Sequence, residues 1–309
     1  MSGPVAVIDV GSNSIKLLVA RAGADQSIEA LFTETIETRI SAGISRDLPN
    51  LTDKAIEDGC KSVVELVRLA REYEPEKIKV VATSAVRDAL NGQDFIDCVF
   101  EKTGIKVRVL TGSEEATYIG QGLACDPQLA GAEDYIQVDL GGGSLELIRF
   151  KKAKIEQALS LRLGAVRLSE RFVTDREAPV LKNVETAIDA FVHAELSQSD
   201  FKFTPRKDTL VATGGAFVVC RAILAAQKHQ RVDEHYPVLK IEELEALKQQ
   251  LCALPLHERM TVPHLPASRA DIIPAALITI LALLHHAGRK SLTHSFYNLR
   301  YGVAAELLQ

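Results

Sequence analysis

Apolar residues in the first part of the chain predict three consecutive strands, followed by alternating helices and strands. The apolar run VAVIDV (5–10) is typical of a buried strand, and SIKLLVAR (14–21) alternates as a strand does. A third strand-like segment spans 27–40, and three strands in sequence predict a meander. Spacing and end signals then predict helices over 53–73, 94–104 and 114–125, with strands over 77–85 and 105–110.

The second part of the chain gives a similar order of elements. The pattern predicts strands at 134–140, 144–150, 154–163 and 209–213, and helices near 178–198, 215–229, 241–252 and 269–287. The final segment, YGVAAELLQ (301–309), has a helical pattern.

Two pairs of similar segments share one offset and indicate an internal duplication. IDVGSNSIKLLV (8–19) aligns with VDLGGGSLELIR (138–149), so that Asp139 matches Asp9 at an offset of 130 (139 − 9). VATSA (81–85) aligns with VATGG (211–215) at the same offset (211 − 81). We therefore expect two copies of one α/β architecture.

Three consecutive glycines, Gly141, Gly142 and Gly143, join two strand-like runs of the second copy. A dinucleotide-binding fingerprint would place a third glycine at the start of a helix, but residue 146 is a glutamate in a strand-like run. The P-loop motif GxxxxGK[ST] does not occur either. Two interpretations stay open: a plain hairpin turn, or a turn whose amides surround phosphate oxygens.

Length, charge and cysteine usage narrow the class of protein. A chain of 309 residues favours two domains, and a net charge of −5 argues against a protein that wraps nucleic acid. The five cysteines are scattered, as expected for reduced thiols, and the N-terminal segment has no basic and then apolar leader pattern. The longest apolar segment, 272–284, is short for a membrane span. We expect a cytoplasmic protein with no nucleic acid or membrane partner.

Several ordered stretches resemble the exopolyphosphatase and guanosine pentaphosphate phosphohydrolase (Ppx/GppA) family, within the acetate kinase, sugar kinase, Hsp70 and actin superfamily. The stretches are AVIDVGSNSIKLL (6–18), ATSAVRDA (82–89), LTGSEEATYIG (110–120), VDLGGGSLEL (138–147), LRLGAVRLSE (161–170), RADIIPA (269–275) and LRYG (299–302). The resemblance implies an α/β fold of two tandem ribonuclease H-like (actin-like ATPase) domains around a central cleft. It assigns residues 1–121 and about 297–309 to the first domain, against which the final segment would pack, and 122–296 to the second.

The resemblance also implies an activity. Such proteins release the terminal phosphoryl group of inorganic polyphosphate with water and Mg²⁺ or another divalent cation. The alternatives are hydrolysis of guanosine pentaphosphate (pppGpp) to the tetraphosphate (ppGpp), non-catalytic binding of ppGpp or polyphosphate, and a kinase or ATPase of the same superfamily. A homodimer is compatible with all of them. The chain departs from the family pattern at TRISAG (38–43), at Ala216 and at Ala276, and these departures bear on substrate preference.

The motifs assign candidate roles to individual residues. Glu115 matches the catalytic glutamate of the family and is the expected general base, with Arg87 and Ser144 as further catalytic residues. Its neighbour Glu114 lies about 100° away on a helix, so one of the two should face the site, where crowding by anions could raise the pKa of Glu115. The plain alternative is that both carboxylates stabilise the helix N-terminus.

The remaining candidates would bind phosphate or metal. Carboxylates suit Mg²⁺, and we expect them at the ends of the duplicated strands, at Asp9, Asp139 and Glu146. Arg162, Arg167 and Arg300 are equally compatible with the site and with a solvated surface. The expected substrate-binding residues are Gly11, Ser12, Asn13, Ser14, Lys16, Gly141, Gly142, Gly143, Gly214 and Gly215.

Overall fold

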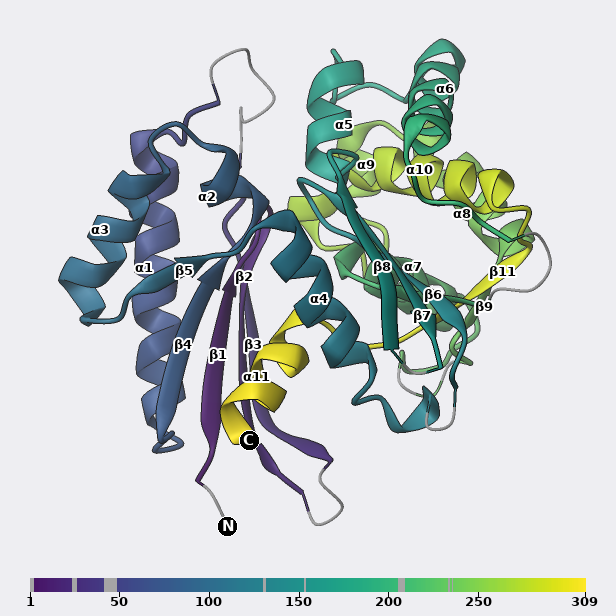
Figure 1. The fold of residues 1–309 in the computed structure, drawn as a ribbon. Helices are drawn as coiled ribbons and strands as arrows, with labels where there is room; N and C mark the ends of the chain where they lie inside the picture. Colours follow the sequence, from purple (N-terminus) through teal and green to yellow (C-terminus); the bar gives the residue numbers. More distant parts are fainter. Residues whose placement is uncertain are drawn as a thin grey trace. The chain divides into compact units, whose positions relative to one another are not determined.

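A computed structural model of the chain describes residues 3–23, 27–41, 49–129, 132–152, 154–204, 209–232, 234 and 236–309. The chain divides into two compact units, one formed by Met1–Ala132 with Tyr297–Gln309 and the other by Glu133–Phe296. Each unit contains one β-sheet and several helices (Figure 1). The predicted α/β class is therefore confirmed.

The sheet of the first unit has five strands in the order β3-β2-β1-β4-β5. Strands β1, β2 and β3 are antiparallel neighbours, which confirms the predicted meander, whereas β4 and β5 run parallel to β1. This order is that of a ribonuclease H-like domain. The strands are β1 (Val5–Val10), β2 (Ser14–Ala22), β3 (Ile28–Glu37), β4 (Lys77–Ala82) and β5 (Val107–Val109).

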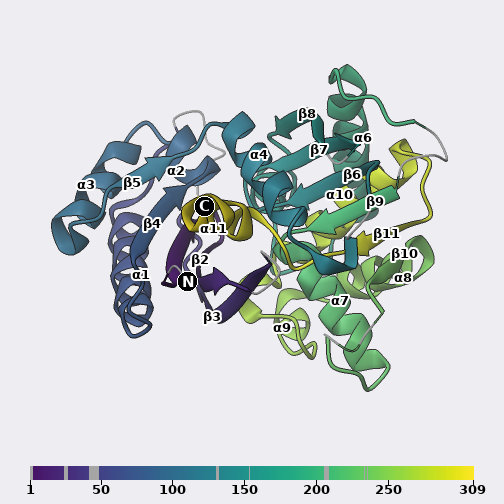
Figure 2. The same cartoon turned by 60° about the horizontal axis from the view of Figure 1, so that its bottom comes forward.

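Helices cover both faces of this sheet (Figures 1 and 2). Ala6, Ile8 and Val10 of β1 belong to the core cluster that contains α1 and α3, so the alternate residue Asp9 points to the opposite face. That face carries α4 and α11. The helices are α1 (Asp53–Arg71), α2 (Ser84–Asp88), α3 (Gly92–Thr103), α4 (Gly112–Leu123) and α11 (Leu299–Leu308).

The C-terminal helix α11 packs directly on α4, with two glycines at the point of contact. A Cβ atom on Gly122 would lie 1.9 Å from the backbone oxygen of Asn298, and one on Gly302 would lie 1.9 Å from that of Tyr118. Glu306 of α11 accepts a hydrogen bond from Tyr118 at 2.5 Å. The C-terminal segment thus forms a helix that belongs to the first unit.

The sheet of the second unit has six strands in the order β10-β11-β9-β6-β7-β8. Its β6, β7 and β8 form a second antiparallel meander, and β9 runs parallel to β6 on the other side. These four strands repeat the arrangement of the first sheet. The strands are β6 (Tyr135–Leu140), β7 (Leu145–Lys151), β8 (Lys154–Leu161), β9 (Thr209–Thr213), β10 (Val238–Lys240) and β11 (Ser291–His294).

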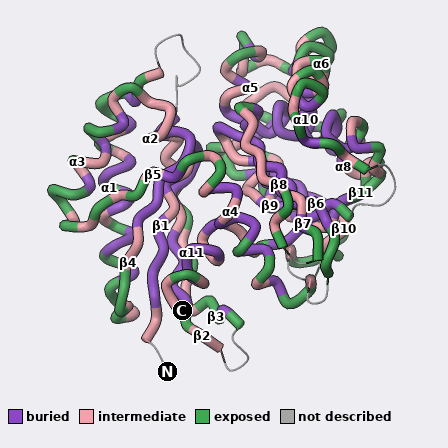
Figure 3. The backbone as a smooth tube through the Cα atoms, in the orientation of Figure 1, coloured by how far each residue is buried: buried purple, intermediate pink, exposed green. Residues whose placement is uncertain are grey.

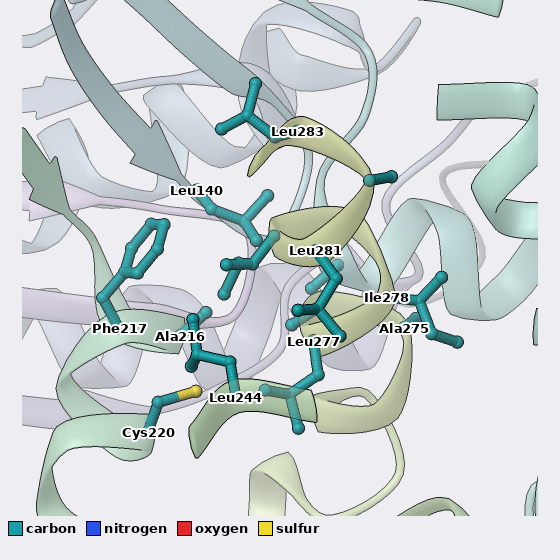
Figure 4. Packing of buried hydrophobic residues seen from close by; sticks show 14 of the residues in the cluster. Leu140, Ala216, Phe217, Cys220, Leu244, Ala275, Leu277, Ile278, Leu281 and Leu283 are labelled. Carbon is teal, nitrogen blue, oxygen red and sulfur yellow. The ribbon is translucent and has the colours of Figure 1, made fainter. Parts of the chain in front are cut away.

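The core of the second unit forms around α10, which is apolar on all sides and buried along most of its length (Figures 3 and 4). Leu277 and Leu281 of this helix pack with Phe217 of α7 and Leu244 of α8 in one cluster. Among the described residues, no helix has the length and apolar character that crossing a membrane requires. The helices are α5 (Ala165–Phe172), α6 (Lys182–Gln198), α7 (Gly215–Gln227), α8 (Ile241–Ala253), α9 (Leu256–Arg259) and α10 (Ile273–His286).

One predicted element boundary near the site was wrong, and some short elements were not predicted. The strand expected over 77–85 ends at Ala82, and the helix α2 begins at Ser84, with Thr83 as its N-cap residue. No element was predicted for residues 164–177, where the structure has α5. The short strands β10 and β11 were also not predicted.

Candidate active site

The turn between β1 and β2 of the first unit is closed by its own backbone. The amide of Gly11 donates to the carbonyl oxygen of Ser14 at 3.1 Å, and the side chains of Ser12, Asn13 and Ser14 are buried. The hydroxyl of Ser12 lies 2.9 Å from that of Ser84 at the start of α2. This contact joins the predicted phosphate turn to the helix that carries Arg87.

The side chain of Asn13 is hydrogen-bonded to residues at the end of β3 and just after it. Its Nδ2 donates to Glu37 Oε2 at 2.5 Å, and its Oδ1 accepts from Arg39 Nε at 3.3 Å. The carbonyl oxygen of Asn13 also accepts from the amides of Thr38 and Arg39, at 3.1 and 2.9 Å. Asn13 therefore braces the turn against β3, and its contact with phosphate stays a prediction.

Asp9 lies opposite Lys16 in the β1–β2 register, on the face covered by α11. Burial raises the pKa of Asp9, whereas the charges of Lys16 and Arg300 act to lower it. Its Oδ1 atom is buried and has no hydrogen-bond partner among the described residues. Arg300 is half-buried and donates to the carbonyl oxygen of Leu17 at 2.8 Å, so it is part of this site's surroundings and not a solvated surface charge.

Glu115 and Arg87 form a close ion pair at the N-terminus of α4. The Nη1 atom of Arg87 lies 2.6 Å from Glu115 Oε2 and also donates to the carbonyl oxygen of Leu110 at 3.1 Å. The side chain of Glu115 is only 8% exposed, and that of Arg87 is 22% exposed. Two opposite charges this close attract each other more strongly than at the surface, because solvent screens buried groups less.

Glu114 has a different role from its neighbour. It forms a capping box with Thr111, in which its carboxylate accepts from the Thr111 amide at 2.9 Å and the Thr111 hydroxyl accepts from the Glu114 amide at 3.2 Å. Arg108 forms an ion pair with the Glu114 carboxylate at 2.9 Å. The Thr111 amide, followed by Arg108, lowers the pKa of Glu114 to about 2. The capping box turns the Glu114 side chain back to the N-cap of α4, whereas Glu115, one residue further, is buried.

The corresponding turn of the second unit packs on the start of α5. The Gly141 amide donates to the Ser144 carbonyl at 3.0 Å, and the amides of Ala165 and Val166 donate to the carbonyls of Gly141 and Gly142 at 3.0 and 2.8 Å. A Cβ atom on Gly164 would lie 2.3 Å from the carbonyl oxygen of Gly142. The backbones are therefore in direct contact, which requires a glycine at position 164.

A row of polar side chains crosses the second sheet next to this turn. Asp139 is the register partner of Glu146 on β7 and of Thr213 on β9, and all three are buried. Thr213 Oγ1 donates to Asp139 Oδ2 at 2.5 Å, and Ser160 Oγ donates to Glu146 Oε1 at 2.8 Å. The carboxylates of Asp139 and Glu146 therefore lie on neighbouring strands at the same level of the sheet. Ser144 is buried at the start of this hairpin.

This carboxylate pair fits the requirements of Mg²⁺, which binds one or two carboxylates and completes its shell with water and substrate oxygens. No group of three or more His, Cys, Asp or Glu side chains that could hold a metal occurs within the described ranges. The predicted set of Asp9, Asp139 and Glu146 draws on both units and stays a prediction.

Gly214 and Gly215 lie at the start of α7. Gly214 has φ +105°, which L side chains rarely adopt, and a Cβ atom there would also lie 2.9 Å from Asp139 Oδ1. A Cβ atom on Gly215 would lie 2.1 Å from Nη1 of Arg269. Arg269 thus brings a cation to these glycines and was not predicted, although it lies in the RADIIPA segment. Arg167 likewise touches the glycine turn, since its Nε donates to Gly143 at 3.1 Å, whereas Arg162 is exposed.

Comparison with known proteins gives consistent matches along the chain. The sequence model of the Ppx/GppA phosphatase family matches residues 18–309. The crystal structure of an exopolyphosphatase from Cytophaga hutchinsonii is 25% identical, with a TM-score of 0.87, covering 99% of this chain and 97% of that one. A Ppx/GppA family member from Aquifex aeolicus is 26% identical, with a TM-score of 0.80 and coverages of 99% and 97%.

A further structure of the Aquifex aeolicus PPX-GPPA enzyme is 27% identical, with a TM-score of 0.79, and covers 98% of this chain and 99% of that one. These matches share the two-sheet α/β architecture described above, and each spans both units. With the family match over nearly the whole length, they show that the chain belongs to the Ppx/GppA phosphatase family.

Proposed function

We propose that this protein is a metal-dependent exopolyphosphatase, which hydrolyses the terminal phosphoanhydride of inorganic polyphosphate and releases orthophosphate. The observation that carries the proposal is the ion pair of Arg87 with the buried Glu115, whose atoms lie 2.6 Å apart at the start of α4. A carboxylate can accept a proton and a guanidinium can bind phosphate, so the pair supports a role for both side chains in the reaction. The match to an exopolyphosphatase over 99% of this chain supports the choice of substrate.

In the proposed reaction, a water molecule attacks the terminal phosphorus atom and Glu115 accepts a proton from it. The bond between that phosphorus and the bridging oxygen breaks, and the products are orthophosphate and a chain one phosphate shorter. Arg87 binds the oxygens of the transferring group, because its planar guanidinium has five N–H donors and can bond phosphate while it orients Glu115. Each of the turns at 11–14 and 141–144 offers backbone and hydroxyl donors of the kind that bind phosphate oxygens.

Asp139 and Glu146 would hold the divalent cation. When bound, such an ion neutralises negative charge on the phosphate oxygens. Thr213 and Ser160 orient the two carboxylates through their hydroxyl groups, at 2.5 and 2.8 Å. Partners that orient metal ligands in this way commonly contribute to metal affinity.

The test is release of orthophosphate from polyphosphate by wild-type protein and by Glu115→Gln, with Mg²⁺ present. The substitution keeps the shape and the hydrogen bond to Arg87 but removes the proton acceptor, so kcat should fall roughly 10²- to 10⁴-fold while polyphosphate binding persists. Glu114→Gln is the matched control, because it alters the adjacent carboxylate, which caps the helix. Equal kcat for wild type and Glu115→Gln would remove Glu115 from this role.

The same assay with pppGpp tests the principal alternative. The residues at the site bind phosphate groups, which both substrates contain, so their chemistry does not select between them. Release of phosphate from pppGpp alone would reassign the protein as a pppGpp 5′-phosphohydrolase. Binding of either compound without any metal-dependent release would indicate a sensor.

A further inference from the structure

Arg39, two residues after the end of β3, has a backbone conformation that arginine rarely adopts. Its φ is +44°, in the left-handed region that glycine occupies readily and that side chains with a Cβ atom resist. A residue held in this region costs free energy, and such positions cluster at functional sites because the surroundings must enforce them. The sequence nevertheless carries an arginine here.

The surroundings that enforce this conformation belong to the β1–β2 turn. The amides of Thr38 and Arg39 both donate to the carbonyl oxygen of Asn13, at 3.1 and 2.9 Å. The Nε atom of Arg39 then donates to Asn13 Oδ1 at 3.3 Å, while Glu37 holds the other side of the same amide. Backbone and side chain of Arg39 are therefore both fixed to one residue of the turn.

Other positive-φ residues show what an ordinary turn looks like in this chain. Among the described residues, Glu74, Lys152, His229 and His264 also have positive φ without being glycine, and all four are exposed. Arg39 differs because it is half-buried and hydrogen-bonded to a proposed phosphate turn. A tight turn alone would explain the backbone, but it would not explain a guanidinium fixed to Asn13.

We propose that Arg39 is a substrate-binding residue that holds a phosphoryl group of the polyphosphate chain at the 11–14 turn. The hydrogen bond from Nε fixes the plane of the guanidinium, and a guanidinium binds phosphate oxygens through paired N–H donors. Partial burial reduces screening of its charge by solvent. The inference deepens the proposed function and rests on it, since it assigns a further cation to the same substrate.

Binding of tripolyphosphate without divalent metal, measured by isothermal titration calorimetry, tests the proposal. Arg39→Gly keeps the left-handed backbone and removes only the side chain, so its unfolding midpoint should be no lower than that of wild type. Its Kd should rise roughly 10- to 100-fold, the range expected for loss of a hydrogen-bonded charge. Arg39→Lys retains the charge without the planar group, so its Kd should lie between those of wild type and Arg39→Gly.

Arg21→Ala is the matched control, because Arg21 belongs to the same β2–β3 hairpin and forms an exposed ion pair with Glu29 at 2.8 Å. Its Kd should equal that of wild type. Three results would overturn the inference: unchanged affinity in Arg39→Gly, equally weakened binding in Arg39→Gly and Arg21→Ala, or no binding by wild type. An Arg39-dependent Kd in a protein that releases no phosphate with Mg²⁺ would instead refute the hydrolase activity and support the binding role.

Discussion

His294, at the end of β11, should make the stability of the protein depend on pH. This side chain is 1% exposed, and its Nδ1 atom lies 3.3 Å from Nη1 of Arg221, which is also buried. Its ring contacts Phe296 edge to face, with centroids 4.8 Å apart. Burial, followed by the charge of Arg221, lowers the pKa of His294 from 6.5 to about 3. The native protein therefore holds a neutral imidazole.

The direction and size of the effect follow from this difference. Below pH 6.5 the unfolded chain binds a proton at His294 that the native protein does not, so stability falls as the pH falls from 6.5 towards 3. Each pH unit in this window costs about 1.4 kcal/mol. Between pH 7 and pH 5 the free energy of unfolding should therefore fall by about 2 kcal/mol from this residue alone.

His294→Asn isolates this contribution, because the amide oxygen can accept from Arg221 and does not titrate. Urea unfolding followed by circular dichroism at pH 7 and pH 5 gives the free energy for both proteins. We expect the variant to be the less stable at pH 7, since it loses the ring contact, and to gain about 2 kcal/mol relative to wild type at pH 5. An equal difference between the two proteins at both pH values would refute the reasoning.

Three further predictions concern the capping carboxylate, the helix contact and the metal. Glu114→Ala should lower Tm while turnover stays at the wild-type level, and the stabilising contribution of Glu114 should be lost as pH falls from 4.5 through its pKa of about 2. Gly122→Ala should cost about 3 kcal/mol or more of unfolding free energy, because its Cβ would lie 1.9 Å from the Asn298 carbonyl oxygen. Chelation by EDTA should abolish phosphate release, and Mg²⁺ should restore it; release that persists in EDTA would exclude the metal.

The regular elements of the fold could be predicted because each has a strong local pattern. The apolar run of β1 and the helical spacing of α1 specify their own conformation, and the shared offset of 130 between the two copies indicates the repeated sheet. The elements that escaped prediction are short. β10 and β11 gain their conformation from pairing with each other and with β9, and a segment of three or four residues carries too little pattern to show this.

The site could be predicted in its residue types but only in part in its geometry. Helical periodicity alone does not show which of two adjacent glutamates faces the site. The capping box with Thr111 engages Glu114 and so distinguishes it from Glu115. Arg39 lies in the TRISAG stretch and Arg269 in the RADIIPA stretch, but neither arginine was assigned a role from the sequence. Their contacts with Asn13 and Gly215 arise from tertiary structure, which brings together residues far apart in sequence.

The duplicated rows of side chains carry an argument about where a cation binds. In the first unit, Asp9 lies opposite Lys16, so the pair is neutral overall. The residue at the same place in the second unit, 130 positions later, is Glu146, which lies opposite Asp139. Two buried carboxylates side by side repel each other unless a proton or a cation lies between them. The same sheet position thus holds an acidic and a basic residue in the first unit and two acidic residues in the second. This difference supports placing the divalent ion at Asp139 and Glu146.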